Sequence, residues 1–440
     1  MTPKGMGWII VDALDTLILM NLTTELAHAR DWVSTTLDYD QDHDVNTFET
    51  TIRMLGGLLS AHYLTTAFPN MAPLPAITGG DDLYLEKASD LADRLLSAYE
   101  SSSGIPFASV NLKQMKGLPS HADGGASSTA EATTLQLEMK YLSKLTGEEL
   151  YWTKAENVMK VVDDNGAKAG LVPIFIYADG PHAGTFRESY IRLGSRGDSY
   201  YEYLIKQYLQ TSKQEPVYQE MWEEALAGVR KHLITYSSPS NLTFIAELPS
   251  GVGGEIHPKM DHLVCFMPGT IALGATEGLT VAEARKQKGK WGPKQENDIL
   301  LAKELMKACY GMYRVTKTGL APEITYFHTH KPPKLGGLYP EGSLHAPEIE
   351  GETGEEQWRE DYDIKPADTH NLQRPETVES LFYMWRITGD EKYRHWGWEI
   401  FESFVKYTMV EDGEGFSSIN DVNQIPPPAR DNMESFWLVS

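Results

Sequence analysis

The sequence predicts an all-α protein in which paired inner and outer helices form an α/α barrel. Apolar residues recur with a helical period through most of the chain. Helices that open with acidic clusters alternate with plainer helices rich in Lys and Glu, which suits an inner ring covered by an outer ring. Strand-like runs are few. In chain order, we expect helices at 47–67, 82–99, 128–145, 148–162, 199–210, 216–234, 297–315, 375–387 and 391–407.

Each expected helix has an apolar stripe and is bounded by Gly, Pro, Ser or Asp. In the first helix the stripe contains Ile52, Leu55 and Leu58, spaced three residues apart. The strand-like runs at 171–177, 190–193 and 241–248 are expected to form short β-hairpins in connecting loops. A strand–helix–strand rhythm and a glycine-rich phosphate motif are both missing from the sequence, which argues against a nucleotide-binding α/β fold.

Composition limits the classes of partner. The 440 residues carry 39 Lys and Arg against 62 Asp and Glu, a net charge of −23. Nucleic acid or an anionic membrane would repel such a surface, so neither is expected as a partner. Hydrophobic residues make up 41% of the chain, enough for a large core, and the absence of a linker predicts one domain over 1–440. We also expect no membrane segment, since a run of about 18 apolar residues is not evident.

Three acidic positions could carry chemistry, because each lies in the first turn of a strong helix. Glu376 and Glu379 are three residues apart and share one helix face. Such acids also complement the helix dipole, which is the purely structural alternative. Asp198 could equally be a helix N-cap. Glu49 and Arg53 could form a simple i, i+4 ion pair, although apolar neighbours argue for a more enclosed place.

Other patterns have structural explanations. Ser128 and Glu131 fit a helix capping box, and Glu434 fits a cap as well. His328 and His330 have the spacing of a strand or loop, without an evident third metal ligand. The only two cysteines, Cys265 and Cys309, permit one disulfide in an oxidising compartment but do not require it.

Several acids that converge on the mouth of a ring of helices suggest glycoside hydrolysis. That reaction uses two carboxylates, one to protonate the leaving oxygen and one to activate water or attack the sugar. An excess of carboxylates could also hold Ca²⁺, which binds six to eight oxygens. The residues alone do not name the sugar.

At these same clusters the sequence resembles the family 47 glycoside hydrolases, the α-1,2-mannosidases of N-glycan processing. The similarity extends in order along essentially the whole chain. It is carried by WIIVDALDTL at Trp8–Leu17, VNTFETTIRMLGGLL at Val45–Leu59, HADGGASSTAE at His121–Glu131, GSRGDSYYEY at Gly194–Tyr203, MDHLVCF at Met260–Phe266, GLAPE at Gly319–Glu323 and HNLQRPETVES at His370–Ser380.

The resemblance implies an (α/α)7 barrel, inversion at the sugar carbon, and dependence on Ca²⁺. It implies that Glu49 is a proposed general acid, Asp198 a second candidate acid acting through water, and Glu376 the general base. Glu323, Glu376 and Glu379 would hold waters around Ca²⁺. Cys265 and Cys309 would be disulfide-bonded. The implied sugar contacts are Arg53, Arg196, His262, Arg374 and Phe436.

Arg196 resembles the endoplasmic-reticulum type, which trims one mannose from the nine-mannose glycan. The implied setting is the lumen of that compartment or the secretory pathway, and the implied partners are high-mannose N-glycans on glycoproteins. We expect a monomer. An inverting pair of carboxyls needs room for a water, roughly 6.5–9.5 Å.

The family pattern also leads us to expect that the barrel is incomplete at both ends. The first helix upstream of Trp8 would be missing, as would the last helix and a plug hairpin after Leu438. With them would go a glutamate where Ser440 stands and a threonine that binds Ca²⁺ directly. The alternative function is therefore a mannosidase-like glycan-binding adaptor of quality control, inactive because that calcium ligand is missing.

Overall fold

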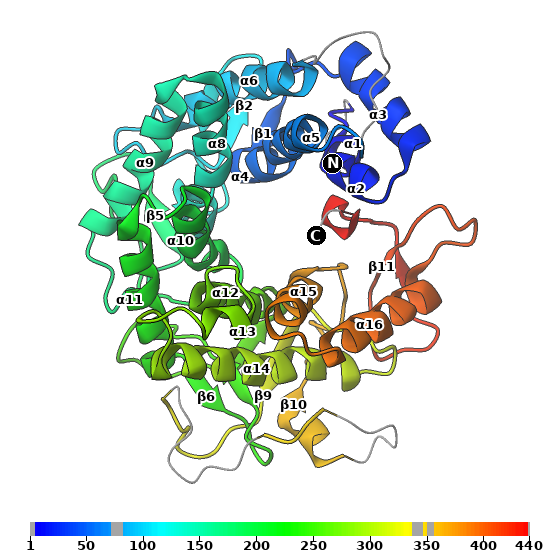
Figure 1. Cartoon of the computed structure of the whole chain (residues 1–440). Coiled ribbons are helices and arrows are strands. Elements are labelled where there is room, and N and C mark those ends of the chain that lie inside the picture. Colours follow the sequence, from blue (N-terminus) through cyan, green and yellow to red (C-terminus); the bar gives the residue numbers. More distant parts are fainter. Residues whose placement is uncertain (1–4, 72–81, 337–345, 350–355, 439–440) are drawn as a thin grey trace. The chain divides into compact units, whose positions relative to one another are not determined.

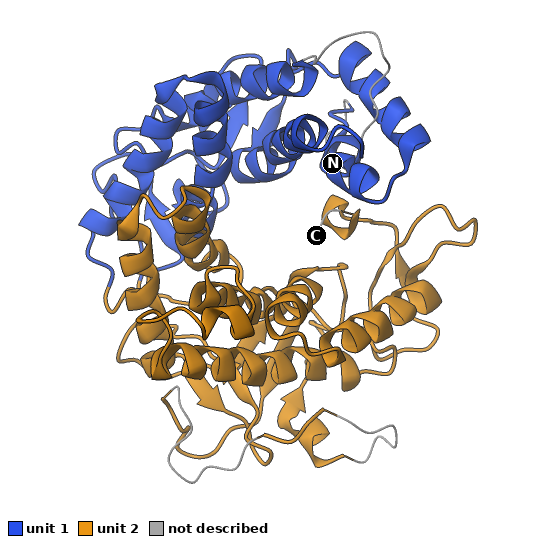
Figure 2. Cartoon of the chain, in the orientation of Figure 1, with its two compact units in different colours: residues 1–167, 173–188, 439 blue, residues 168–172, 189–438, 440 orange. Residues whose placement is uncertain are grey.

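The structure is a computed structural model that describes residues 5–71, 82–336, 346–349 and 356–438 (Figure 1). Ser440 lies outside the described residues. The chain divides into two compact units (Figure 2). Unit 1 contains residues 1–167 and 173–188, and unit 2 contains residues 168–172 and 189–438.

Unit 1 is built from helices around a core of Val, Leu and Ala side chains, with two small antiparallel sheets, β1-β2-β3 and β4-β5. Its helices are α1 Trp8–Asp12, α2 Leu14–Leu19, α3 Thr23–Thr35, α4 Thr47–Glu49, α5 Gly56–Ala67, α6 Leu83–Leu95, α7 Thr129–Thr133, α8 Gln136–Thr146 and α9 Glu149–Asp164. Its strands are β1 Asp44–Asn46, β2 Ser109–Asn111, β3 Lys116–Leu118, β4 Ala126–Ser128 and β5 Phe175–Tyr177.

The helix predicted at 47–67 is confirmed, but its middle is wider than expected. α4 continues without a break into a π-helical segment, Thr50–Leu55, and then into α5. Such π segments inside α-helices are frequently found at functional sites. This segment contains Arg53 and directly follows Glu49, so the irregular turn lies at two of the predicted site residues.

The single helix predicted at 128–145 is wrong. Residues 126–128 form β4, and the helical region is interrupted at Thr134 and Leu135, between α7 and α8. Thr133 and Thr134 each donate a side-chain hydrogen bond to a backbone carbonyl four residues earlier. Such hydroxyls compete with the regular helix ladder and weaken it slightly, which is consistent with the interruption here.

Unit 2 contains longer helices and three small sheets with the orders β10-β9-β8, β6-β7 and β11-β12. Its α-helices are α10 Asp198–Gln210, α11 Pro216–His232, α12 Met267–Thr276, α13 Val281–Ala284, α14 Pro293–Arg314, α15 Glu376–Thr388 and α16 Lys392–Thr408. Short 3₁₀ helices are found at Leu96–Tyr99 in unit 1 and at His262–Phe266, Gln357–Asp361 and Ser435–Leu438 in unit 2. Its strands are β6 Ile234–Tyr236, β7 Thr243–Ile245, β8 Lys259–Asp261, β9 Ile324–Phe327, β10 Tyr362–Asp363, β11 Ser418–Ile419 and β12 Ala429–Arg430.

Helix α12 is the core helix of unit 2 and was not predicted. It is apolar on every side, so it has no stripe with a helical period, and it packs against α14 and α15. A Cβ atom at Gly269 would lie 3.1 Å from the Cα of Ser380, so glycine permits this close approach. The stretch 262–284 is also long and apolar enough to cross a membrane, which the sequence analysis did not expect. Because 61% of its most apolar window is buried inside the protein, it has the character of a core helix.

The strand predictions are confirmed in part. The runs at 171–177 and 241–248 contain β5 and β7, both shorter than predicted. At 190–193 the structure has one isolated bridge, from Ile191 to Leu248, in place of a strand.

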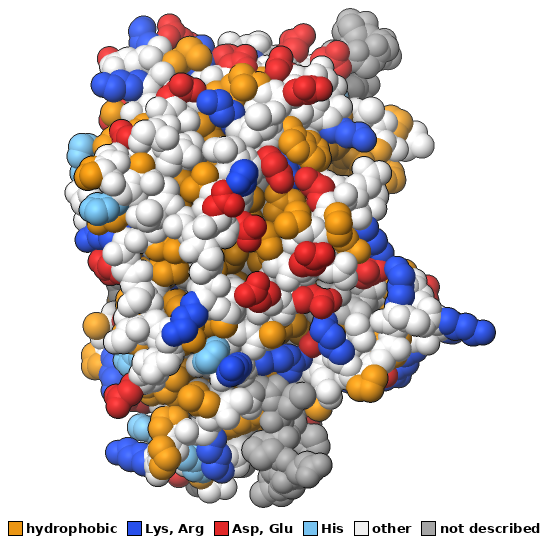
Figure 3. Space-filling view, turned by 90° about the vertical axis from the view of Figure 1, so that its left-hand side faces the viewer, with side chains coloured by type: hydrophobic (Ala, Val, Ile, Leu, Met, Phe, Trp, Pro, Cys, Tyr) orange, Lys and Arg blue, Asp and Glu red, His pale blue; other side chains and the backbone are white. Residues whose placement is uncertain are grey.

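Acidic, basic and hydrophobic side chains are interspersed on the face of the molecule drawn in Figure 3.

Candidate active site

In unit 2, helices α10 and α15 each begin with a predicted catalytic acid. Asp198 is the first residue of α10, and Glu376 is the first residue of α15. Asp198 is not the N-cap, a position that Gly197 occupies. One oxygen of its carboxylate accepts a hydrogen bond of 2.9 Å from the backbone of Ser199. A helix begins with free N–H groups, so the first turn of each helix favours a carboxylate.

The surroundings of these two acids drive their pKa values in opposite directions. Burial raises the pKa of Asp198 to about 7, and the negative charges of Glu376, Glu202 and Asp261 add to the effect. Burial also acts to raise the pKa of Glu376, but His262 and Arg374 outweigh it and lower that pKa. At neutral pH, one acid can therefore hold a proton while the other is ionised, as acid and base catalysis requires.

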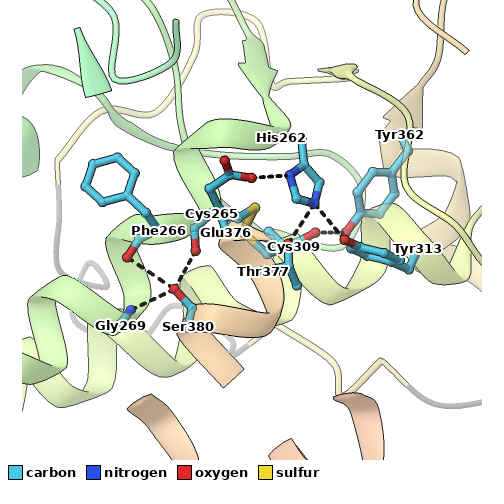
Figure 4. The surroundings of a disulfide bond; sticks show 11 residues. His262, Cys265, Phe266, Gly269, Cys309, Tyr313, Tyr362, Glu376, Thr377 and Ser380 are labelled. Atoms are coloured by element: carbon cyan, nitrogen blue, oxygen red, sulfur yellow. Dashed lines mark hydrogen bonds and ion pairs between the residues drawn. A yellow bond between two sulfur atoms is a disulfide. The ribbon is translucent and has the colours of Figure 1, made fainter. Parts of the chain in front are cut away.

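His262 is held behind Glu376 by a network of hydrogen bonds (Figure 4). Its Nδ1 lies 3.1 Å from a carboxylate oxygen of Glu376, and its Nε2 lies 2.7 Å from the hydroxyl of Tyr313 and 3.0 Å from that of Thr377. Only 2% of the His262 surface is exposed, and both ring nitrogens have protein partners. The structure thus gives His262 a clear role in orienting Glu376, while its predicted contact with the sugar stays a prediction.

The disulfide lies beside this network. Cys265 and Cys309 are bonded, with their Cα atoms 5.8 Å apart, which confirms the pairing implied by the family resemblance. Cys265 follows His262 in the same 3₁₀ helix, and Cys309 precedes Tyr313 on α14. Ser380 on α15 donates a hydrogen bond of 2.5 Å to the carbonyl of Cys265. The bond therefore joins the 3₁₀ helix that carries His262 to the helix that carries Tyr313, the hydrogen-bond partner of His262.

The other predicted residues in unit 2 surround the same two helices. Arg374 Nε forms an ion pair of 2.5 Å with Glu323, whose second oxygen accepts a hydrogen bond from the backbone of Leu372. The guanidinium of Arg374 lies 5.9 Å from the ring centre of Phe436. Arg196 has a left-handed backbone, with φ of 74°, in the turn just before Asp198. Arg374 and Phe436 together offer a cation and an aromatic face for a ligand.

Two charged residues of this cluster, Glu202 and Lys206, were not predicted as site residues. Both lie on α10, one and two helical turns after Asp198. Lys206 forms ion pairs with Glu202 and with Glu379, the latter at 3.3 Å. Burial raises the pKa of Glu379, and the negative charges of Glu202 and Glu376 add to it while Lys206 opposes it. The i, i+4 spacing from Asp198 could have indicated Glu202, whereas nothing local pairs Lys206 with Glu379.

The described residues include no group of three or more His, Cys, Asp and Glu placed to hold a metal ion directly. Glu323 is ion-paired with Arg374, and Glu379 is ion-paired with Lys206. The chemistry of Glu379, whose pKa is raised by burial and by the nearby carboxylates Glu202 and Glu376, still suits a cation held there through water molecules.

In unit 1, Glu49 and Arg53 form the i, i+4 ion pair that was the structural alternative for these residues, with 2.6 Å between Arg53 Nε and Glu49 Oε2. A second carboxylate, Asp12, lies 3.6 Å from Arg53 and is buried. Asn46 caps α4 by accepting a hydrogen bond of 2.7 Å from the backbone of Glu49, and its amide donates to Glu131. The predicted capping box is only half present. The Ser128 side chain accepts a hydrogen bond from the backbone of Glu131, but the Glu131 carboxylate accepts one from Asn46.

The chain matches the family model described as glycosyl hydrolase family 47 over residues 1–440. The chain belongs to glycosyl hydrolase family 47. It is 52% identical to a mannosyl-oligosaccharide 1,2-alpha-mannosidase of Candida albicans, over 99% of this chain and 71% of that protein. It is 44% identical to the endoplasmic reticulum mannosyl-oligosaccharide 1,2-alpha-mannosidase of Saccharomyces cerevisiae, over 99% of this chain and 78% of that protein.

Among solved structures, this family 47 chain is similar to an alpha-1,2-mannosidase from Trichoderma reesei. The TM-score is 0.81 at 27% sequence identity, with 99% of this chain and 83% of that chain covered. The likeness confirms the predicted fold class, all-α of the α/α-barrel type with small sheets. The prediction of a single domain over residues 1–440 stays a prediction.

Proposed function

We propose that this chain is an inverting, exo-acting α-1,2-mannosidase that trims high-mannose N-glycans from nine mannoses to eight. The family and the printed names of the relatives support the substrate class. The observation that carries the chemistry is the pair at the start of α10 and α15, where Asp198 is disposed to be protonated and Glu376 to be ionised. Two carboxylates with separated pKa values are what a glycosidase needs for acid and base catalysis.

In the proposed reaction, Asp198 gives its proton to the glycosidic oxygen as the bond from that oxygen to the mannose carbon breaks. A water molecule attacks the same carbon from the opposite face and gives a proton to Glu376. Mannose leaves with inverted configuration, and the shortened glycan leaves with a new hydroxyl. Glu49 is the other candidate for the acid, and it forms an ion pair with Arg53.

The remaining predicted residues would bind the sugar and the cation. Arg374, Arg196 and Arg53 would donate hydrogen bonds to hydroxyl oxygens, and Phe436 would stack on the sugar face. Glu323, Glu376 and Glu379 would hold waters around Ca²⁺, which would bind hydroxyl oxygens of the sugar and help to hold a distorted ring. The excess of carboxylates at Glu202, Glu376 and Glu379 supports a cation there.

We further propose that the protein acts as a monomer in the endoplasmic reticulum lumen or secretory pathway. The names of the yeast and human relatives support this location. The disulfide supports it as well, because disulfides persist in oxidising compartments.

Incubation of the purified protein with a nine-mannose oligosaccharide and Ca²⁺ tests this function. We expect the loss of one α-1,2-linked mannose, measured by mass spectrometry, and proton NMR of the first product should show the inverted anomer. EDTA should abolish the reaction, and added Ca²⁺ should restore it. Binding of the glycan without release of mannose would contradict the enzyme and support the adaptor.

The pH profile of kcat/KM is expected to be bell-shaped. Glu376 must be ionised, and its pKa is lowered from 4.5, so activity should rise at a pH below that value. Asp198 must be protonated, and its pKa is about 7, so activity should fall as the pH rises through about 7. Initial rates from pH 3 to about 9, the range in which both groups titrate, measure both limbs. A flat profile through neutral pH would contradict the assignment of Asp198 as the acid.

A further inference from the structure

The acid Asp198 follows a tight turn, Gly194–Gly197, that lies on the side chain of Asp261. The carbonyl of Gly194 accepts hydrogen bonds from the backbone of Gly197 at 3.1 Å and of Asp198 at 3.0 Å. The backbone N–H of Ser195 donates to Asp261 Oδ2 at 3.1 Å. A Cβ atom on Gly194 would lie only 2.3 Å from that same oxygen. The turn can therefore reach Asp261 only because residue 194 has no side chain.

Asp261 is itself held by a chain of buried groups. Lys259 Nζ lies 2.6 Å from Asp261 Oδ1 and 2.9 Å from Glu247, and Tyr190 donates to Glu247 at 2.5 Å. Asp261, Lys259 and Glu247 are each less than 9% exposed. Buried ionic groups that satisfy one another in this way are fixed in position, because breaking one contact leaves a charge unpaired.

Asp261 and His262 are consecutive residues at the end of β8, and each supports a different catalytic group. The Asp261 side chain holds the turn before Asp198, whereas His262 bonds to Glu376. β8 is paired with β9, with Asp261 opposite Ile324, and the backbone of His262 donates to the carbonyl of Glu323 at 2.9 Å. One short segment of sheet thus aligns the acid and the base.

We propose that Asp261 is a positioning residue that fixes the turn carrying Arg196 and Asp198, and so sets the direction in which Asp198 delivers its proton. This inference rests on the proposed hydrolase function. It adds to that function a residue, Asp261, that acts through the turn before Asp198 and not by contact with the reacting atoms. The charge of Asp261 has a second consequence, since it is one of the groups that keep Asp198 protonated, together with Glu376 on α15 and Glu202 on α10. Three cations face these carboxylates: Arg374 lies near Glu376 and Asp198, Lys206 pairs with Glu202, and Lys259 pairs with Asp261.

Three single variants test the proposal. D261N removes the charge, and G194A places a methyl group where the Asp261 oxygen lies while leaving that charge in place. Both should lower kcat/KM on the order of 10- to 100-fold, the penalty expected when a catalytic group is displaced by about 1 Å. Only D261N should also move the basic limb of the pH profile to lower pH, because a neutral residue 261 makes the Asp198 proton easier to lose.

E247Q is the matched control. It disturbs the same buried network at Lys259 but lies one ion pair further from the turn. It should lower thermal stability as much as D261N does and leave the basic limb unchanged, with a much smaller loss of kcat/KM. Equal losses of activity in E247Q and D261N, or a D261N variant with the wild-type profile, would overturn the positioning role.

Failure of the positioning role and failure of the proposed function give different results. If the wild-type protein binds the nine-mannose glycan without hydrolysing it, the hydrolase function fails, and the variants are then compared by calorimetric affinity for the glycan. Weaker binding of the glycan by D261N and G194A than by E247Q would still indicate that Asp261 positions Arg196. Equal affinities would contradict it.

Discussion

Replacement of Glu376 by glutamine should abolish turnover, with kcat reduced about 10²- to 10⁴-fold, the usual contribution of a general base. Glutamine has the same shape as glutamate but cannot take the proton from the attacking water. It can still accept the hydrogen bond from His262, so the fold of α15 should survive. Single-turnover rates on the nine-mannose glycan measure the effect, and thermal unfolding checks the fold. An E376Q variant with wild-type kcat would contradict the assignment of the base.

The same experiment can identify the acid if D198N and E49Q are compared. α-Mannosyl fluoride is a suitable probe, because fluoride leaves without a proton from the enzyme. A variant that lacks the acid should be rescued on this substrate, whereas E376Q should not. We expect rescue of D198N, since burial raises the pKa of that carboxyl to about 7. Rescue of E49Q alone would transfer the role to Glu49.

Removal of the disulfide in the double variant C265S/C309S should have the second large effect. The two cysteines are 44 residues apart in sequence, and a loop of that length predicts a loss of about 4 kcal/mol in the free energy of unfolding. Urea denaturation measures this loss. We also expect kcat to fall under conditions where the variant is still folded, because the bond joins the elements that carry His262 and Tyr313.

S380A is the control for the second effect. It removes the hydrogen bond from α15 to the Cys265 carbonyl but leaves the disulfide intact. A loss of activity in C265S/C309S well beyond that in S380A would show that the bond aligns the base and does more than stabilise the chain. A folded double variant with wild-type kcat would restrict the disulfide to stability.

Local patterns in the sequence were sufficient for the helices with a clear apolar stripe. The helices at 47–67, 148–162 and 199–210 were predicted because their stripe repeats within a few turns. Helix α12 was missed because it is buried on all sides and has no stripe, and the break at Thr134 was missed because two side-chain hydroxyls oppose the helix that the apolar pattern favours. The family motifs indicated Asp198, Glu376 and the cysteines, because each motif is a short segment that can be recognised by itself.

The sequence by itself determined where carboxylates stand at the starts of helices, because helix entry and capping depend on a few neighbouring residues. Only the tertiary structure decided in which direction the pKa of each acid is shifted. Burial raises the pKa of Asp198, and the charges of Glu376, Glu202 and Asp261 add to it, whereas His262 and Arg374 outweigh burial at Glu376 and lower its pKa. It also placed Lys206 against Glu379, and Asp261 under the turn before Asp198. These contacts join residues far apart in the chain, and electrostatic energy depends on distance in space.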